Sequence, residues 1–180
     1  QSVDVVFVAM HGGFGEGGPL QEILERMKLA YTGPAAASSR LAMDKGVARR
    51  CFLKAGLRVP GAHMVYALRR FWLRPGALRY PVVVKPASQG SSIGVSFVAE
   101  PGALRAAVDE ALRFDRVVLI EDFIRGREVT VSVLDGRALP IVEVVPKKSF
   151  FDFQAKYEKG MTEYLVPAPL DPSVASRVQE

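Results

Sequence analysis

The sequence predicts an α/β fold made of small α+β lobes, and three stretches of the chain carry this prediction. Val3–Met27 has the pattern of a strand, a glycine-rich loop and an amphipathic helix, which is the order found in a parallel α/β sheet. Val82–Glu121 holds β-branched runs on either side of a helical pattern. Glu128–Val145 alternates around Asp135-Gly136, which predicts an antiparallel hairpin.

Each element is expected from its own local pattern. Val3–Ala9 predicts the first strand, and Leu29–Pro34 supplies a short strand after the first helix. Ser38 or Ser39 is expected to cap a second helix that ends at Gly56. The residues expected on the apolar face of that helix are Val47, Ala48, Cys51, Phe52 and Ala55. Later elements are expected at His63–Ala67, Val82–Lys85, Ile93–Val98, a helix opened by Pro101, and Val117–Glu121.

The C-terminal part of the chain has a less regular sequence pattern. Lys147–Glu163 is polar and aromatic-rich without a steady period, which predicts an ordered functional loop. Asp171-Pro172 predicts the cap and first residue of a helix. Because this helix is cut off soon after it begins and the first strand has no lead-in, we expect the chain to be the middle of a longer protein.

Composition narrows the class of protein. With 49% hydrophobic and 24% charged residues over 180 positions, the chain has the make-up of a soluble globular protein. No apolar run reaches about 18 residues, so no membrane partner is expected. The single cysteine, Cys51, excludes an internal disulfide and indicates a reducing compartment, the cytoplasm; its helix face predicts a buried thiol.

The net charge of +5 does not by itself indicate nucleic-acid binding. Basic residues such as Arg49-Arg50 and Lys147-Lys148 are scattered, and no basic run interleaves with aromatics. A solvated surface accounts for most of them, and a positive balance also suits the polyanion ATP. We expect no nucleic-acid partner.

A lysine followed by a glycine- and serine-rich loop is the most informative feature. Lys85 ends a β-branched run and leads into Pro86–Gly94. Backbone N–H groups of such a loop can face one anion, and the hydroxyls of Ser88, Ser91 and Ser92 add donors. The combination favours a polyphosphate site. The loop has neither the P-loop order nor the dinucleotide fingerprint, so an ordinary hairpin turn stays an alternative.

Three more charged residues suit either the same nucleotide or the surface. Lys45 is a second phosphate cation or a solvated lysine. Glu121 and Glu128 can accept hydrogen bonds from an adenine amino group or ribose hydroxyls, or they are surface acids that face Arg125 and Arg127.

His11 lies in a glycine loop directly after a strand, where ligands bind in α/β sheets. Its glycine neighbours offer little packing, so a ligand role and a structural role stay equal alternatives. Glu16 can orient His11 or pair with a substrate ammonium. No second histidine or cysteine lies at ligand spacing, so no metal-binding residue is assigned.

The aromatic segment Phe150–Tyr157 is either a covering flap or a lid over a reaction site. In a lid, Lys156 would reach a transferring phosphoryl group and Tyr157 would offer a hydroxyl inside a dry site.

Five segments, in order along nearly the whole chain, resemble the D-alanine–D-alanine ligases of the ATP-grasp superfamily. They are His11–Glu16, Ala42–Lys45, Val84–Gly94, Glu121–Glu128 and Phe151–Tyr157. The resemblance implies an ATP-grasp fold that grips ATP between its central and C-terminal lobes. It implies the end of an N-terminal parallel α/β substrate-binding lobe at 1–36, the central lobe with its phosphate-binding loop at 37–121, and the start of the C-terminal lobe at 122–180, with a mobile loop at 147–163.

The resemblance also implies residue roles. The nucleotide-binding residues it implies are Lys45, Lys85, Ser91, Ser92, Glu121, Asp122, Phe123, Ile124, Glu128 and Lys156. The implied catalytic residues are His11, Glu16, Ser91, Lys156 and Tyr157. The reaction it implies joins two D-alanines through an acyl phosphate, for peptidoglycan synthesis, with ATP, Mg²⁺ and D-alanine as the small molecules and a homodimer as a possible assembly.

Some family features are altered or lie outside the chain. Gly17 replaces a common aspartate, and Phe151 and Phe153 stand where tyrosines are common. The magnesium carboxylates are expected beyond the C-terminal end of the chain, so we expect the chain alone to be inactive. Another ATP-grasp carboxylate–amine ligase and a non-catalytic ATP-binding module stay open as alternatives.

Overall fold

The computed structural model describes residues 3–72, 74–146 and 161–180. The chain forms two compact units, Gln1–Phe123 and Ile124–Glu180. The three expected lobes, with boundaries after residues 36 and 121, stay a prediction.

A small parallel sheet opens unit 1. Strand β1 (Val5–Val6) pairs in parallel with β2 (Ala30–Tyr31). Helices α1 (Gly13–Glu16) and α2 (Pro19–Arg26) connect the two strands. The predicted strand–helix–strand order is confirmed, although β1 is shorter than the apolar run that predicted it.

The single helix predicted after Ser38 or Ser39 is wrong. Two helices are present, α3 (Ala36–Met43) and α4 (Lys45–Lys54). Asp44 separates them in an extended conformation, and its side chain accepts a hydrogen bond from the N–H of Val47 at 2.9 Å. A capping carboxylate of this kind starts a new helix because it satisfies an N–H group that lacks a partner in the first turn.

The second half of the expected apolar face of α4 is exposed, contrary to the prediction of a buried Cys51 thiol. Cys51 is exposed rather than buried, and Phe52 keeps 48% of its surface in solvent. Helical spacing shows which residues share a face, but burial requires a covering element, and no described element covers the second half of α4. The helix does stop as predicted before Gly56, which has a left-handed φ of 78°.

A four-stranded antiparallel sheet forms the centre of unit 1. Its strands lie in the order β3-β6-β4-β5. Their bounds are Ala62–Tyr66 (β3), Val82–Pro86 (β4), Ser96–Val98 (β5) and Val117–Asp122 (β6). The 3₁₀ turns η1 (Ala67–Trp72), η2 (Pro75–Ala77) and η3 (Pro101–Ala103) lie between strands, and η3 leads into helix α5 (Leu104–Ala111).

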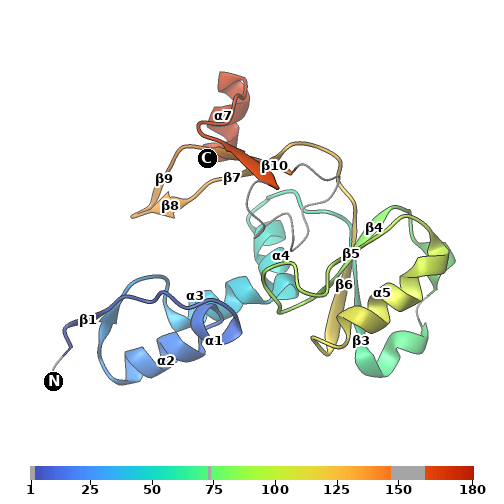
Figure 1. Ribbon diagram of the computed structural model, residues 1–180, viewed down its shortest axis with the longest axis horizontal. Helices are drawn as coiled ribbons and strands as arrows, with labels where there is room; N and C mark the ends of the chain where they lie inside the picture. The colour runs from blue at the N-terminus through green and yellow to red at the C-terminus, as the bar shows by residue number, and fades with distance from the viewer. Residues whose placement is uncertain (1–2, 73, 147–160) are drawn as a thin grey trace. The chain divides into compact units, whose positions relative to one another are not determined.

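Helix α5 covers one face of this sheet (Figure 1). Val84 and Val118 of the sheet and Leu104 of the helix are fully buried there. Because strand side chains alternate between faces, Lys85, Leu119 and Glu121 belong to the opposite face. The hydrophobic core therefore fixes the sheet from one side, and Lys85 and Glu121 project from the other side beside the buried Leu119.

Unit 2 is built on a second antiparallel sheet in the order β11-β10-β7. The bounds are Glu128–Thr130 (β7), Val142–Pro146 (β10) and Thr162–Leu165 (β11). The predicted hairpin is confirmed as β8 (Val133–Leu134) and β9 (Arg137–Ala138), with Asp135 and Gly136 at φ of 49° and 74°. Positive φ at both central residues is typical of a type I′ turn.

The predicted C-terminal helix is α7 (Pro172–Gln179). Asp171 caps it by accepting a hydrogen bond from the N–H of Ser173 at 2.9 Å. Most of the predicted loop Lys147–Glu163 lies outside the described residues, and its end is strand rather than loop, since β11 begins at Thr162. Across the described part of the chain, no helix is long and apolar enough to cross a membrane.

Candidate nucleotide site

The start of helix α4 is bonded to the segment that follows strand β4. The backbone N–H of Lys45 donates to the carbonyl of Ala87 at 2.9 Å. The Lys45 ammonium donates to the carbonyl of Gln89 at 2.5 Å. Gly46 allows the close approach of α4 to β3, because a Cβ there would lie 2.8 Å from the Cε of Met64. These contacts hold Lys45 beside the sheet face that carries Lys85.

Lys85 and Glu121 meet across neighbouring strands. Val83 is paired with Glu121 and Lys85 with Leu119, so Lys85 and Glu121 are diagonal neighbours on one face. The Lys85 ammonium forms an ion pair with the Oε2 atom of Glu121. Their side chains are only 24% and 13% exposed, so this charge pair lies largely out of water.

The electrostatics of this cluster suit an anion. Burial lowers the pKa of the Lys45 ammonium, and the positive charge of Lys85 lowers it further. Two cations held together with partial loss of hydration repel each other, and a bound anion removes that repulsion. The residues present therefore fit a polyphosphate, and the phosphate-binding roles of Lys45 and Lys85 stay predictions.

The serine- and glycine-rich loop has a tightly turned backbone. Ser91, Ser92 and Gly94 all have left-handed φ values, of 53°, 57° and 68°. The N–H of Ser88 donates to the Asp115 carboxylate at 2.7 Å, so this donor is already used within the protein. Successive left-handed residues can turn neighbouring N–H groups toward one anion, which is what the predicted role of Ser91 and Ser92 requires.

An aromatic pair lies on the same sheet face as Lys85. Phe97 is paired with Val83 in the register of β5 and β4. Its ring meets that of Phe123 edge to face, with centroids 5.0 Å apart and planes at 82°, and Phe97 is 44% exposed. The pair offers a flat base an apolar surface beside Lys85 and Glu121. The sequence analysis named Phe123 but not Phe97. Because side chains alternate along β5, the neighbouring core residue Val98 implies that Phe97 points to the other face of the sheet.

Asp122 was predicted to bind the nucleotide, but it lies on the opposite face of the sheet from Lys85 and Glu121. It is paired with Val82 and therefore lies on the α5 side, away from Glu121. Its backbone N–H donates to the carbonyl of Gly61 at 2.9 Å, so neither group faces the Lys85 cluster.

The glycine loop of His11 has its own geometry. Glu16 accepts a hydrogen bond from the N–H of Gly12 at 2.8 Å, and its other oxygen lies 3.9 Å from the Nδ1 atom of His11. The loop borders a pocket of about 530 Å³ that is also lined by Gln21. Gln21 is 4% exposed and donates to the carbonyl of Gly15 at 2.6 Å, which fixes the loop. This arrangement allows Glu16 to orient His11, and the substrate role of both stays a prediction.

Several predicted residues belong to unit 2 or lie outside the described residues. Ile124 is 66% exposed, and Glu128 begins β7, both in unit 2. The Nε atom of Arg127 donates to Glu143 at 2.6 Å, so Arg127 forms its ion pair there. Lys156 and Tyr157 lie outside the described residues, together with Phe151 and Phe153. Their roles stay predictions.

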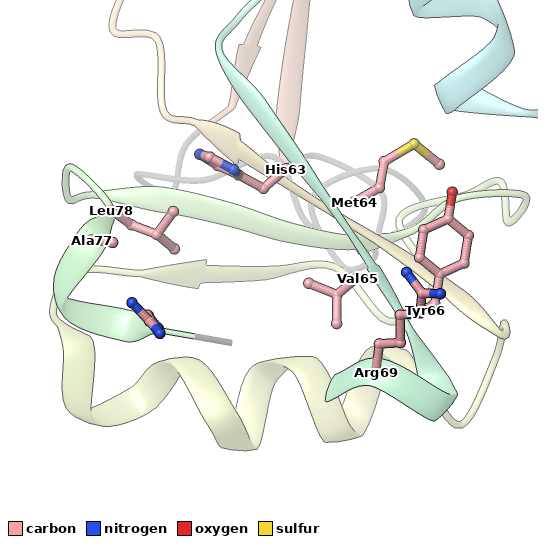
Figure 2. Close-up of a pocket in the computed structure, with 8 residues that line it drawn as sticks. His63, Met64, Val65, Tyr66, Arg69, Ala77 and Leu78 are labelled. Carbon is pink, nitrogen blue, oxygen red and sulfur yellow. The ribbon is translucent and has the colours of Figure 1, made fainter. Parts of the chain in front are cut away.

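Within the described residues, no cluster of three or more histidine, cysteine, aspartate or glutamate side chains could hold a metal ion. A separate pocket of about 410 Å³ lies at the edge strand β3. Figure 2 shows Val65 directed toward helix α5 there, whereas Met64 and Tyr66 lie on the other side of the strand. None of the predicted site residues lines this pocket.

Known proteins resemble this chain along nearly its whole length. The family model described as D-ala D-ala ligase C-terminus matches residues 71–180. A D-alanine–D-alanine ligase from Syntrophotalea carbinolica is 47% identical over 99% of this chain. The chain spans 58% of the length of that relative.

Two solved structures share the fold. The VanG D-Ala:D-Ser ligase from Enterococcus faecalis matches 99% of this chain and 54% of its own, with a TM-score of 0.83 and 30% identity. A D-alanine–D-alanine ligase from Bacillus anthracis complexed with ATP matches 98% of this chain and 56% of its own, with a TM-score of 0.83 and 29% identity. The predicted ATP-grasp fold of α+β lobes is confirmed.

Proposed function

Because the chain belongs to the D-alanine–D-alanine ligase family, we propose that it serves the ATP-dependent joining of two D-alanines into D-alanyl-D-alanine, for peptidoglycan synthesis. The observation that carries the proposal is the convergence of Lys45 and Lys85 beside the serine- and glycine-rich loop. A triphosphate is the anion that such a pair of cations and a nest of N–H groups would hold.

The proposed mechanism gives these residues binding and orienting roles. A carboxylate is a poor electrophile, so the first D-alanine carboxylate takes the γ-phosphoryl group of ATP to form an acyl phosphate, and ADP leaves. The amine of the second D-alanine then attacks the acyl carbon, loses a proton and displaces inorganic phosphate. Lys45 and Lys85 neutralise the phosphate charge, and the Ser91-Ser92 backbone turns N–H groups toward it. Phe97 and Phe123 provide a surface for the base. His11, oriented by Glu16, faces the amino-acid substrate, and Lys156 and Tyr157 keep the catalytic roles that the family resemblance implies.

We further propose Mg²⁺ as a cofactor, the cytoplasm as the compartment and a homodimer as the assembly. The described residues contain no acidic cluster for the metal, so no step of the mechanism is assigned to it. The size of the protein in solution, measured by sedimentation, tests the dimer.

Binding of ATP to the 180-residue chain tests the proposed site. Calorimetry is expected to show binding that Lys85→Ala weakens at least about tenfold, since a cation is lost from the phosphate site. Lys54→Ala is the matched control, because Lys54 is exposed at the far end of helix α4. Equal ATP affinity in the wild-type chain and Lys85→Ala would contradict the site.

A chimera tests the reaction. The chain replaces its counterpart in the Syntrophotalea carbinolica ligase, which supplies the remaining part of a complete relative. Phosphate release that requires D-alanine and yields D-alanyl-D-alanine supports the proposal. The assay includes D-serine, since a D-Ala:D-Ser ligase shares the fold. Release with a different acid indicates another ligase, and ATP binding without release indicates a non-catalytic module.

A further inference from the structure

Arg49 reaches the Lys85–Glu121 pair from helix α4. It follows Lys45 by four residues, and residues at this spacing share one face of a helix. Its Nη1 atom lies 3.7 Å from the Oε1 atom of Glu121, whereas Lys85 contacts Oε2. Glu121 is therefore shared between two cations from different elements. This contact was not predicted from the sequence, because Arg49 belongs to a pair of arginines expected at the surface.

The guanidinium of Arg49 is not a solvated surface charge. The side chain is 19% exposed, and the Nη1 atom is fully buried without a hydrogen-bond partner among the described residues. A buried N–H donor without an acceptor is unfavourable, so this nitrogen is suited to a shorter contact with Glu121 than the 3.7 Å observed.

Glu121 constrains how Lys85 can be used. The carboxylate is 13% exposed, and a carboxylate removed from water needs a positive partner. When the Lys85 ammonium turns to a phosphate, Glu121 loses its nearest counter-charge. Arg49 is a cation on helix α4 that already lies beside this carboxylate, so it can supply the counter-charge.

We propose that Arg49 is a positioning residue of the nucleotide site, which holds the Glu121 carboxylate while Lys85 moves from Glu121 to a phosphate group. The inference rests on the proposed function, because it requires an anionic nucleotide at Lys85. Without Arg49, release of Lys85 leaves an unpaired buried carboxylate, so Lys85 stays with Glu121 and ATP binds more weakly.

A double-mutant cycle separates this role from simple packing of the helix. The variants are Arg49→Met, Glu121→Gln and the two combined, with ATP affinity measured by calorimetry on the 180-residue chain. Arg49→Met is expected to weaken ATP binding about tenfold when Glu121 is present, which corresponds to about 1.4 kcal/mol. In the Glu121→Gln background the same change is expected to weaken binding less than about twofold, because no carboxylate is left to compensate.

Matched variants test whether the loss of ATP affinity is specific to Arg49 and to its charge. Arg50→Met removes the same kind of side chain from the next position, which is exposed, and is expected to leave ATP affinity unchanged. Arg49→Lys keeps the charge and is expected to recover most of the lost affinity. Thermal unfolding of every variant shows which of them are folded, and Arg49→Lys against Arg49→Met still decides the outcome if the double variant does not fold.

The double-mutant cycle has three informative outcomes. An equal loss of affinity from Arg49→Met in both backgrounds overturns the role of Arg49 but leaves the proposed function standing. Failure of the wild-type chain to bind ATP, or insensitivity of its binding to Lys85→Ala, overturns the proposed function and this inference together. A loss that appears only when Glu121 is present supports both.

Discussion

The ammonium group of Lys45 donates a hydrogen bond to the carbonyl of Gln89 at 2.5 Å, across a separation of 44 residues. This bond joins the first residue of helix α4 to the serine- and glycine-rich loop. A residue expected to hold phosphate therefore also fixes the backbone expected to surround that phosphate. Loss of Lys45 should consequently have two effects that a loss of charge alone would not produce.

We predict that Lys45→Met weakens ATP binding by about tenfold or more and speeds amide hydrogen exchange in the loop at residues 88–94. The affinity falls because a phosphate cation is lost, and exchange rises because the tether to Gln89 is lost. Calorimetry and hydrogen exchange followed by mass spectrometry measure the two effects. Lys54→Met, at the exposed end of the same helix, should change neither. If the bond to Gln89 does not hold the loop, amide exchange at residues 88–94 will be equally fast in Lys45→Met and in the wild-type chain.

The lowered pKa of Lys45 predicts a coupling between ATP binding and protons. Burial and Lys85 depress this pKa in the free protein, and bound phosphate should raise it again. At alkaline pH, between the depressed and restored values, ATP binding should therefore take up a proton, and affinity should fall as pH rises through the depressed pKa. Calorimetry in buffers of different ionisation enthalpy measures the uptake. It should vanish in Lys45→Met, and uptake that persists there would assign the proton to another group.

The sequence predicted which residues bear charge near the site, but not how they meet. Lys45 was predicted from its position before a helical face and Lys85 from its position at the end of a strand, and the structure brings both to one place. The contact of Arg49 with Glu121 depends on how α4 packs against the sheet, which helical spacing alone does not specify. The face shared by Lys85 and Glu121 depends on the register of β4 against β6.

The wrong prediction of a single helix in place of α3 and α4 also arose because long-range contacts cannot be read from local patterns. The apolar spacing predicted one helix with a buried Cys51 thiol, yet Asp44 starts a new helix and the face around Phe52 is exposed. The capping preference of aspartate was readable in the sequence, but its use depends on the bond between Lys45 and Ala87 that turns the chain there. Local patterns thus identified elements and turns, and long-range contacts decided boundaries and burial.

Gly94 has a conformation and a neighbourhood that exclude a side chain. Its φ is +68°, and a Cβ there would lie 2.7 Å from the Cδ2 atom of Phe114 and 2.9 Å from the Cγ atom of Pro86. We predict that Gly94→Ala lowers the free energy of unfolding by roughly 1–3 kcal/mol, from backbone strain and displaced neighbours. Gly90→Ala is the matched control in the same loop, because a Cβ at Gly90 meets nothing within 4 Å. Urea denaturation of both variants measures the difference, and equal stabilities would contradict the described loop.

Arg127 and Glu143 form the main ion pair described in unit 2. Two guanidinium nitrogens of Arg127 donate to the Glu143 carboxylate, which is 7% exposed, and one also donates to the carbonyl of Pro169 at 3.0 Å. These hydrogen bonds hold the pKa of Glu143 below its usual value. The folded state binds fewer protons at this group than the unfolded state, so the stabilisation is present above the ordinary glutamate pKa and is lost as pH falls through the lowered one.

We therefore predict that Arg127→Met lowers the unfolding temperature at about pH 7, and that the difference from the wild-type chain is smaller at about pH 3, because acid shifts Glu143 toward its protonated form. Arg125→Met, at an exposed arginine two residues earlier, should leave both temperatures unchanged. Circular dichroism melts compare each of the two variants with the wild-type chain at both pH values. A difference that stays the same size at both pH values would mean that Arg127 stabilises unit 2 through its hydrogen bond to Pro169 and its packing, and not through the charge of Glu143.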